Sequence, residues 1–89
     1  MNRDTVLADL RARGYAGYCF FEDPRGKQNV IVVSFGRDGL QTWIQDERAQ
    51  PIRGSLRTFR EENEALTDFA HRVALWNRVS GVRSPTPQA

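Results

Sequence analysis

Cys19 and His71 are the only cysteine and the only histidine in the chain, so they are the first candidates for nucleophilic chemistry. A cysteine attacks as its thiolate, and a histidine often serves as the base that removes the thiol proton. Cys19, however, lies inside an aromatic, strand-like run, where a cysteine commonly acts as a small apolar side chain. His71 falls outside the apolar stripe of its predicted helix, which consists of Leu66, Phe69, Val73 and Trp76, and is expected at the solvent edge. The sequence therefore predicts no catalytic residue.

Carboxylates are closely spaced in two places, at Asp46-Glu47 and in the run of residues 61–64. Neighbouring residues of a strand point to opposite faces, so Asp46 and Glu47 are not expected to share a proton or a metal ion. The second cluster falls in the first turn of a predicted helix, where negative charge complements the helix dipole. No glycine-rich phosphate-binding motif occurs. We therefore expect a non-enzymatic protein with no metal site and no cofactor.

The composition allows one small domain with a mixed surface charge. The chain has 89 residues, 39% of them hydrophobic, and its 13 basic and 11 acidic residues give a net charge of +2. The two signs alternate along the chain, so no run of like charge marks a nucleic-acid tail or a membrane anchor. The N-terminus lacks the apolar core of a signal peptide, and no stretch is long enough for a membrane span. We expect a cytoplasmic protein that does not contact a membrane.

The elements follow from hydrophobic periodicity and turn residues. A helix is predicted over 5–13, strands over 15–23, 28–35 and 40–47, a short fourth strand over 52–59, and a longer helix from 61 to about 80. Turns at 24–27 and 36–39 predict hairpins, which gives an α+β fold of order α-β-β-β-(β)-α with an antiparallel meander sheet. Gly81 is expected to stop the last helix. Residues 1–81 are thus one domain, and 82–89 are expected to be disordered.

The predicted outer face of the sheet is the expected site of function. Because hairpins cannot cover a face, both helices should pack on one side and leave the other side open. If Leu40 and Ile44 face the helices, Trp43 faces away from them. An uncovered Trp among arginines is typical of a protein interface. The predicted partner-binding residues are Trp43, Tyr18, Glu47, Arg53 and Arg57.

Residues 43–69 resemble a group of small bacterial immunity proteins, the antidotes to polymorphic and contact-delivered toxins. In these proteins a strand ends in an acidic turn with Arg and leads, through a short strand, into F-x-x-E-x-E-A before a long helix. The matching residues are Asp46-Glu47-Arg48, Phe59, Glu62, Glu64, Ala65 and Phe69. Where those turns usually continue with Gly, this chain has Ala49. The resemblance implies an immunity protein that binds a cognate toxin domain and occludes its active cleft.

Two alternatives, a small nucleic-acid-binding or regulatory domain and an obligate homodimer of structural role, use the same open face. The element order also resembles that of double-stranded-RNA-binding domains, but they carry a basic cluster where this chain has the acidic run of residues 61–64. Nucleic-acid binding by the sheet face, through stacking on Trp43 and Tyr18, therefore has little electrostatic support. The other alternative is an obligate homodimer whose sheets pack face to face. The partner, the toxin's activity and the oligomeric state are left open.

Overall fold

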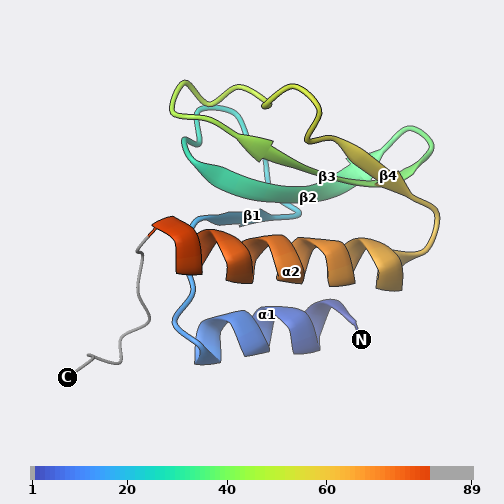
Figure 1. Ribbon diagram of the computed structural model, residues 1–89. Coiled ribbons are helices and arrows are strands. Elements are labelled where there is room, and N and C mark those ends of the chain that lie inside the picture. Colours follow the sequence, from blue (N-terminus) through green and yellow to red (C-terminus); the bar gives the residue numbers. More distant parts are fainter. Residues whose placement is uncertain (1, 81–89) are drawn as a thin grey trace.

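The computed structural model describes residues 2–80, which fold into two helices and one four-stranded sheet (Figure 1). The elements are α1 (Arg3–Ala12), β1 (Tyr18–Phe20), β2 (Val30–Gly36), β3 (Gly39–Gln45), β4 (Arg57–Phe59) and α2 (Glu62–Ser80). The strands lie in the sheet in chain order. The predicted α+β class and element order are therefore confirmed. The predicted helix stop at Gly81 and the predicted disordered tail over 82–89 lie outside the described residues.

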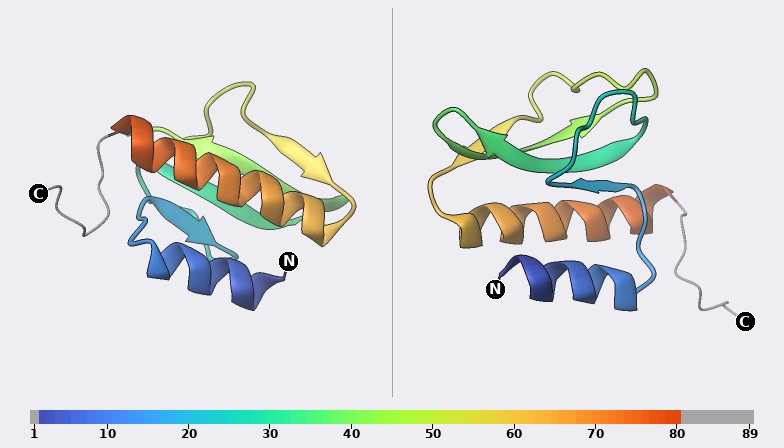
Figure 2. Two further views of the ribbon diagram at one scale, coloured as in Figure 1. Left: turned by 60° about the horizontal axis from the view of Figure 1, so that its bottom comes forward. Right: turned by 180° about the vertical axis from the view of Figure 1, so that it is seen from behind.

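Both helices cover the same face of the sheet, as the sequence predicts (Figures 1 and 2). α2 packs on β2 and β3, and α1 packs beside α2. The core between these layers holds the buried apolar side chains of both helices and β2: Val6, Leu10, Ile31, Val33, Leu66, Phe69 and Val73. The apolar stripe predicted for the long helix thus faces the sheet. No helix within residues 2–80 is long and apolar enough to span a membrane.

The sheet is mixed, because β1 pairs with β2 in parallel, and the predicted antiparallel meander is wrong for this strand. Tyr18 lies opposite Ile31 and Phe20 opposite Val33 in parallel register. The turn at 24–27 does form, with the Lys27 N–H donating to the Pro24 carbonyl over 3.1 Å and with Gly26 at φ 77°. This turn lies within the connection 21–29, which crosses the outer face of the sheet (Figure 2). A turn motif specifies a local reversal of the chain, and it does not specify which strands pair.

The chain leaves β1 at Phe21, whose φ of 54° lies in the left-handed region. This backbone conformation is costly for a bulky residue, so its surroundings must hold it. The Phe21 N–H donates to the Val33 carbonyl over 2.9 Å, and the ring packs 5.0 Å from the ring of Phe35. The guanidinium carbon of Arg3 lies 4.5 Å from the centre of the Phe21 ring. These contacts fix the point where the chain turns away from β2.

β2 and β3 form the predicted antiparallel hairpin, and β4 adds the predicted fourth strand at the opposite edge from β1. β4 is only three residues long and pairs with the first half of β3. The predicted strand over 52–59 is irregular in its first part, since Gly54 adopts a φ of 84° and Ser55 bonds to β3 through its side chain. The Ser55 hydroxyl oxygen accepts the Ile44 N–H over 3.1 Å. The second half of β3 is therefore bordered by an irregular segment.

Asn77 ties the C-terminal part of α2 to the segment that precedes β1. Its side chain is 4% exposed and pairs with both backbone groups of Ala16. The Ala16 N–H donates to Asn77 Oδ1 over 3.0 Å, and Asn77 Nδ2 donates to the Ala16 carbonyl over 2.9 Å. The Asn77 side chain thus makes the two backbone hydrogen bonds that a neighbouring strand would make. It fixes the position of the segment before β1 against α2.

Asn77→Ala should lower the free energy of unfolding by about 1–3 kcal/mol, because it leaves two part-buried backbone groups of Ala16 without partners. Urea unfolding followed by circular dichroism measures the change. Arg78→Ala, on the exposed side of the same turn, should change stability by less than about 0.5 kcal/mol. Equal stability of Asn77→Ala and wild type would show that the hydrogen bonds between Asn77 and Ala16 do not stabilise the fold.

Candidate functional site

Cys19 and His71 lie on opposite sides of the sheet. Cys19 is level with Val32 and Trp43 on the outer face, whereas His71 belongs to α2 on the other side. The thiol is fully buried and donates to the Glu22 carbonyl over 3.5 Å. Burial raises the pKa of the Cys19 thiol, so the protonated form is favoured. The arrangement does not bring this nucleophile and this base together.

Cys19 should therefore react with a thiol reagent such as Ellman's reagent only when the protein unfolds. One equivalent should be released rapidly in denaturant and very slowly in native buffer at neutral pH, because the thiol is both enclosed and protonated. Absorbance of the released thionitrobenzoate measures both rates. Rapid labelling of the folded protein would show that the thiol is accessible.

One carboxylate of each cluster, Asp46 and Glu62, has a structural role. Asp46 Oδ1 accepts the N–H groups of Arg48, over 2.8 Å, and Gln50, over 3.1 Å, and so closes the turn after β3. These backbone bonds, led by that from Gln50, lower the pKa of Asp46. Glu62 lies in the first turn of α2 and binds Arg3. Within residues 2–80 no group of three or more metal-ligating side chains gathers.

Trp43 points away from the helices, as predicted, but the surface around it is partly covered. Its indole N–H donates to Gln45 Oε1 over 3.0 Å. Gln45 Nε2 in turn donates to the carbonyls of Pro24 and Lys27. These two hydrogen bonds hold the 21–29 connection against the outer face. Cys19 and Val32 are consequently fully buried there. The outer face, which the sequence predicts to be open, is therefore covered over Cys19 and Val32.

The five predicted partner-binding residues do not share one surface. Tyr18 faces the helices, where its ring meets Phe69 edge-on with 6.1 Å between ring centres, so its predicted place beside Trp43 is wrong. Glu47 is exposed in the turn after β3. Arg53 and Arg57 line a groove on the helix side, away from Trp43. A role of each residue in partner binding stays a prediction.

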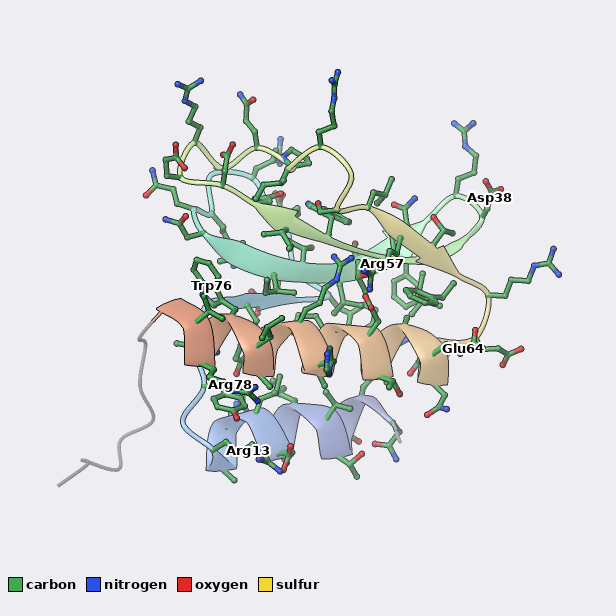
Figure 3. All side chains as sticks on the ribbon, in the orientation of Figure 1. Arg13, Asp38, Arg57, Glu64, Trp76 and Arg78 are labelled. Carbon is green, nitrogen blue, oxygen red and sulfur yellow. The ribbon has the colours of Figure 1, made fainter. Side chains whose placement is uncertain are left out.

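That groove, which we call the α2 groove, runs between α2 and the segment leading into β4. Its volume is about 560 Å³. Ile44 of β3 lies between the two walls, which are formed by the following side chains and by Gly54: Arg53, Ser55, Arg57, His71, Arg72 and Leu75. Figure 3 shows Arg57 of β4 and Trp76 of α2 directed into the space between α2 and the sheet.

One end of the α2 groove is apolar. An adjoining hollow of about 200 Å³ shares Ile44, Arg72 and Leu75 with the groove and is completed by Ile31, Trp76 and Val79. Leu75 and Val79 are four residues apart on α2 and are 46% and 72% exposed. Large apolar side chains that adjoin on a helix surface are typical of a contact surface. Sequence reasoning missed this pair, although both residues lie outside the apolar stripe, where polar residues are expected.

The other part of the α2 groove is cationic. Asp68 of α2 accepts a 2.6 Å hydrogen bond from the Thr42 hydroxyl and forms ion pairs with Arg57 and Arg72. The distance from Arg72 Nε to Asp68 Oδ2 is 3.3 Å. Arg53 forms no ion pair with any residue from 2 to 80. Arg57 and Arg72 therefore share the Asp68 carboxylate, and Arg53 adds a third positive charge to the groove.

Arg72 is the most confined of these charges, with a side chain that is 10% exposed. Its Nη1 is buried and has no hydrogen-bond partner, the single such nitrogen or oxygen among the side chains of residues 2–80. Burial, reinforced by the charge of Arg57, lowers the pKa of Arg72, although Asp68 opposes this shift. A buried donor without an acceptor is unfavourable, so a hydrogen-bond acceptor that reaches Arg72 Nη1 would be stabilising.

Comparison of this chain with protein-family models, with curated proteins and with solved structures finds no match.

Proposed function

We propose that this chain is a protein-binding domain whose partner docks in the α2 groove. The single observation that supports the proposal best is the exposed pair Leu75 and Val79 beside the cationic cluster of Arg53, Arg57 and Arg72. Protein interfaces combine an apolar centre with arginine and aromatic side chains in this way. The groove offers this combination along one continuous surface, and the covered outer face offers less.

The proposed role is binding without catalysis. Cys19 and His71 are separated by the sheet, and Asp46 closes a turn, so the candidate groups for chemistry have no common cavity. The α2 groove contains three arginines and a histidine but no nucleophile other than the Ser55 hydroxyl. That hydroxyl donates to the Ile52 carbonyl over 2.7 Å, which holds the irregular segment in place. The residues of the groove are suited to contact and charge complementarity.

Immunity against a bacterial toxin is the specific form of this role that we propose. It would act by steric occlusion, with the α2 groove seated on the toxin domain next to its active cleft. Because the groove carries an excess of positive charge, the matching toxin surface would be acidic, and the attraction would speed association. The product of the neighbouring gene is the first toxin candidate to be tested.

Leu75→Asp should weaken the complex with the partner at least tenfold, or about 1.4 kcal/mol, because it places a carboxylate in the apolar part of the groove. Isothermal titration calorimetry with the neighbouring gene's product, or with the partner that co-purifies with the tagged chain, gives the affinity. For a toxin partner, the variant should also protect cells less in a growth assay.

Trp43→Ala is the matched control on the outer face, and circular dichroism should confirm that both variants are folded. We expect it to bind the partner as tightly as wild type. Loss of affinity in Trp43→Ala with full affinity in Leu75→Asp would place the site on the outer face and would refute docking in the groove. Absence of any protein partner, with binding to a single-stranded DNA probe that weakens steeply with salt, would favour nucleic-acid binding instead.

A further inference from the structure

We propose that Arg72 and Arg57 form a carboxylate-binding subsite that takes an Asp or Glu side chain of the partner protein, while an apolar neighbour of that residue packs on Leu75 and Val79. This inference rests on the proposed function and deepens it, since it states the chemistry that the partner must present. The partner segment would thus carry an acidic residue beside one or more large apolar residues.

The unmet hydrogen bonding of Arg72 is the first argument for the subsite. A guanidinium carries five N–H donors in a planar fork, which matches the two oxygens of a carboxylate. In Arg72, Nε faces Asp68, and Nη1 is buried without an acceptor. Buried polar groups in native proteins are nearly always paired, so an acceptor that reaches this nitrogen from the groove would satisfy it.

The charge balance of the cluster is the second argument. Asp68 is shared by Arg57 and Arg72 and also accepts the Thr42 hydroxyl, so its oxygens are already in use. One carboxylate cannot compensate two guanidinium groups and the nearby Arg53. The side chain of Arg57 is 57% exposed, whereas that of Asp68 is 13% exposed. Arg57 can therefore turn from Asp68 toward an incoming carboxylate. The subsite requires such a movement, because Arg72 Nη1 is buried in the free chain.

The surroundings favour a protein carboxylate over a nucleic-acid phosphate. Asp68 and Glu64 line the adjoining end of the helix surface, together with Asn63 and His71, and would repel a run of phosphates. At the other end, a nucleic acid would place its charged phosphate backbone against the apolar side chains of Ile44, Leu75 and Val79, which offer it neither water nor cations. A single carboxylate next to an apolar side chain fits both the charged and the apolar part of the groove.

The subsite can be tested first with acetate as a probe. The full chain is titrated with sodium acetate at constant ionic strength, and the side-chain N–H signals of its arginines are followed by NMR. The Nε–Hε signals of Arg72 and Arg57 should shift along a saturable curve, and that of Arg48, in an exposed turn, should not. Equal shifts of all arginines, or none, would overturn the subsite, and so would tighter binding of inorganic phosphate than of acetate.

A second test identifies the peptide sequences that bind to the α2 groove. Peptides chosen from a random displayed library on the immobilised full chain should carry Asp or Glu beside large apolar residues. Arg72→Met and Arg57→Gln should each weaken the selected peptides at least tenfold, whereas Arg48→Gln should leave their affinity unchanged. Arg72→Met also removes an ion pair of the largely buried Asp68, so its fold is checked by circular dichroism. If Arg72→Met fails to fold, the exposed Arg57→Gln variant decides.

The outcomes separate this inference from the proposed function. Peptides that lose affinity in Leu75→Asp but need no acidic residue and ignore Arg72→Met and Arg57→Gln would overturn the subsite and support docking in the groove. A saturable acetate shift at Arg72, with all selected peptides unaffected by Leu75→Asp, would support an anion subsite and contradict docking in the groove. Dependence on Leu75, Arg57 and an acidic residue together would support both.

Discussion

The parallel pairing of β1 with β2 is the constraint on which the rest of the structure depends. Parallel neighbours cannot be joined by a tight hairpin, so the chain must cross a face of the sheet between them. Both helices occupy one face, and the 21–29 connection therefore crosses the other, where the Gln45 side chain holds it. Phe21 begins the crossing in a left-handed conformation that its contacts with Arg3 and Phe35 stabilise. Cys19 and Val32 are buried as a result, and Leu75 and Val79 are exposed on the helix side.

On the helix side, the shortness of β4 determines where the surface is left uncovered. Because β4 pairs only with the first half of β3, the segment 52–56 stands beside the second half without forming a strand. α2 passes this segment at residues 71–79, and the α2 groove lies between them. The same irregularity places Arg53 and Arg57 opposite Arg72. Apolar exposure and excess positive charge thus meet at one place, which is why we assign the binding role to the groove.

The sequence predicts the elements well and their pairing less well. The stripe of Leu66, Phe69 and Val73 correctly indicates the buried side of α2, and Leu40 and Ile44 correctly predict that Trp43 points outward. The parallel strand could not be predicted, because the Pro24–Lys27 turn has the same local chemistry in a hairpin and in a crossing connection. Of the residues that line the groove, Arg53 and Arg57 are predicted from the sequence as partner-binding residues. Arg72 could not be predicted from the sequence. Its importance arises from burial against Asp68, which depends on how α2 packs on β3.

The central claim is that a protein partner occupies the α2 groove and leaves the outer face free. The most direct measurement is NMR mapping of the bound complex, with the methyl groups of the chain and the Trp43 indole labelled. The account predicts that the methyl signals of Ile44, Leu75 and Val79 shift on binding and that the Trp43 indole signal does not. A shift of the Trp43 signal with unchanged signals of Leu75 and Val79 would contradict the account.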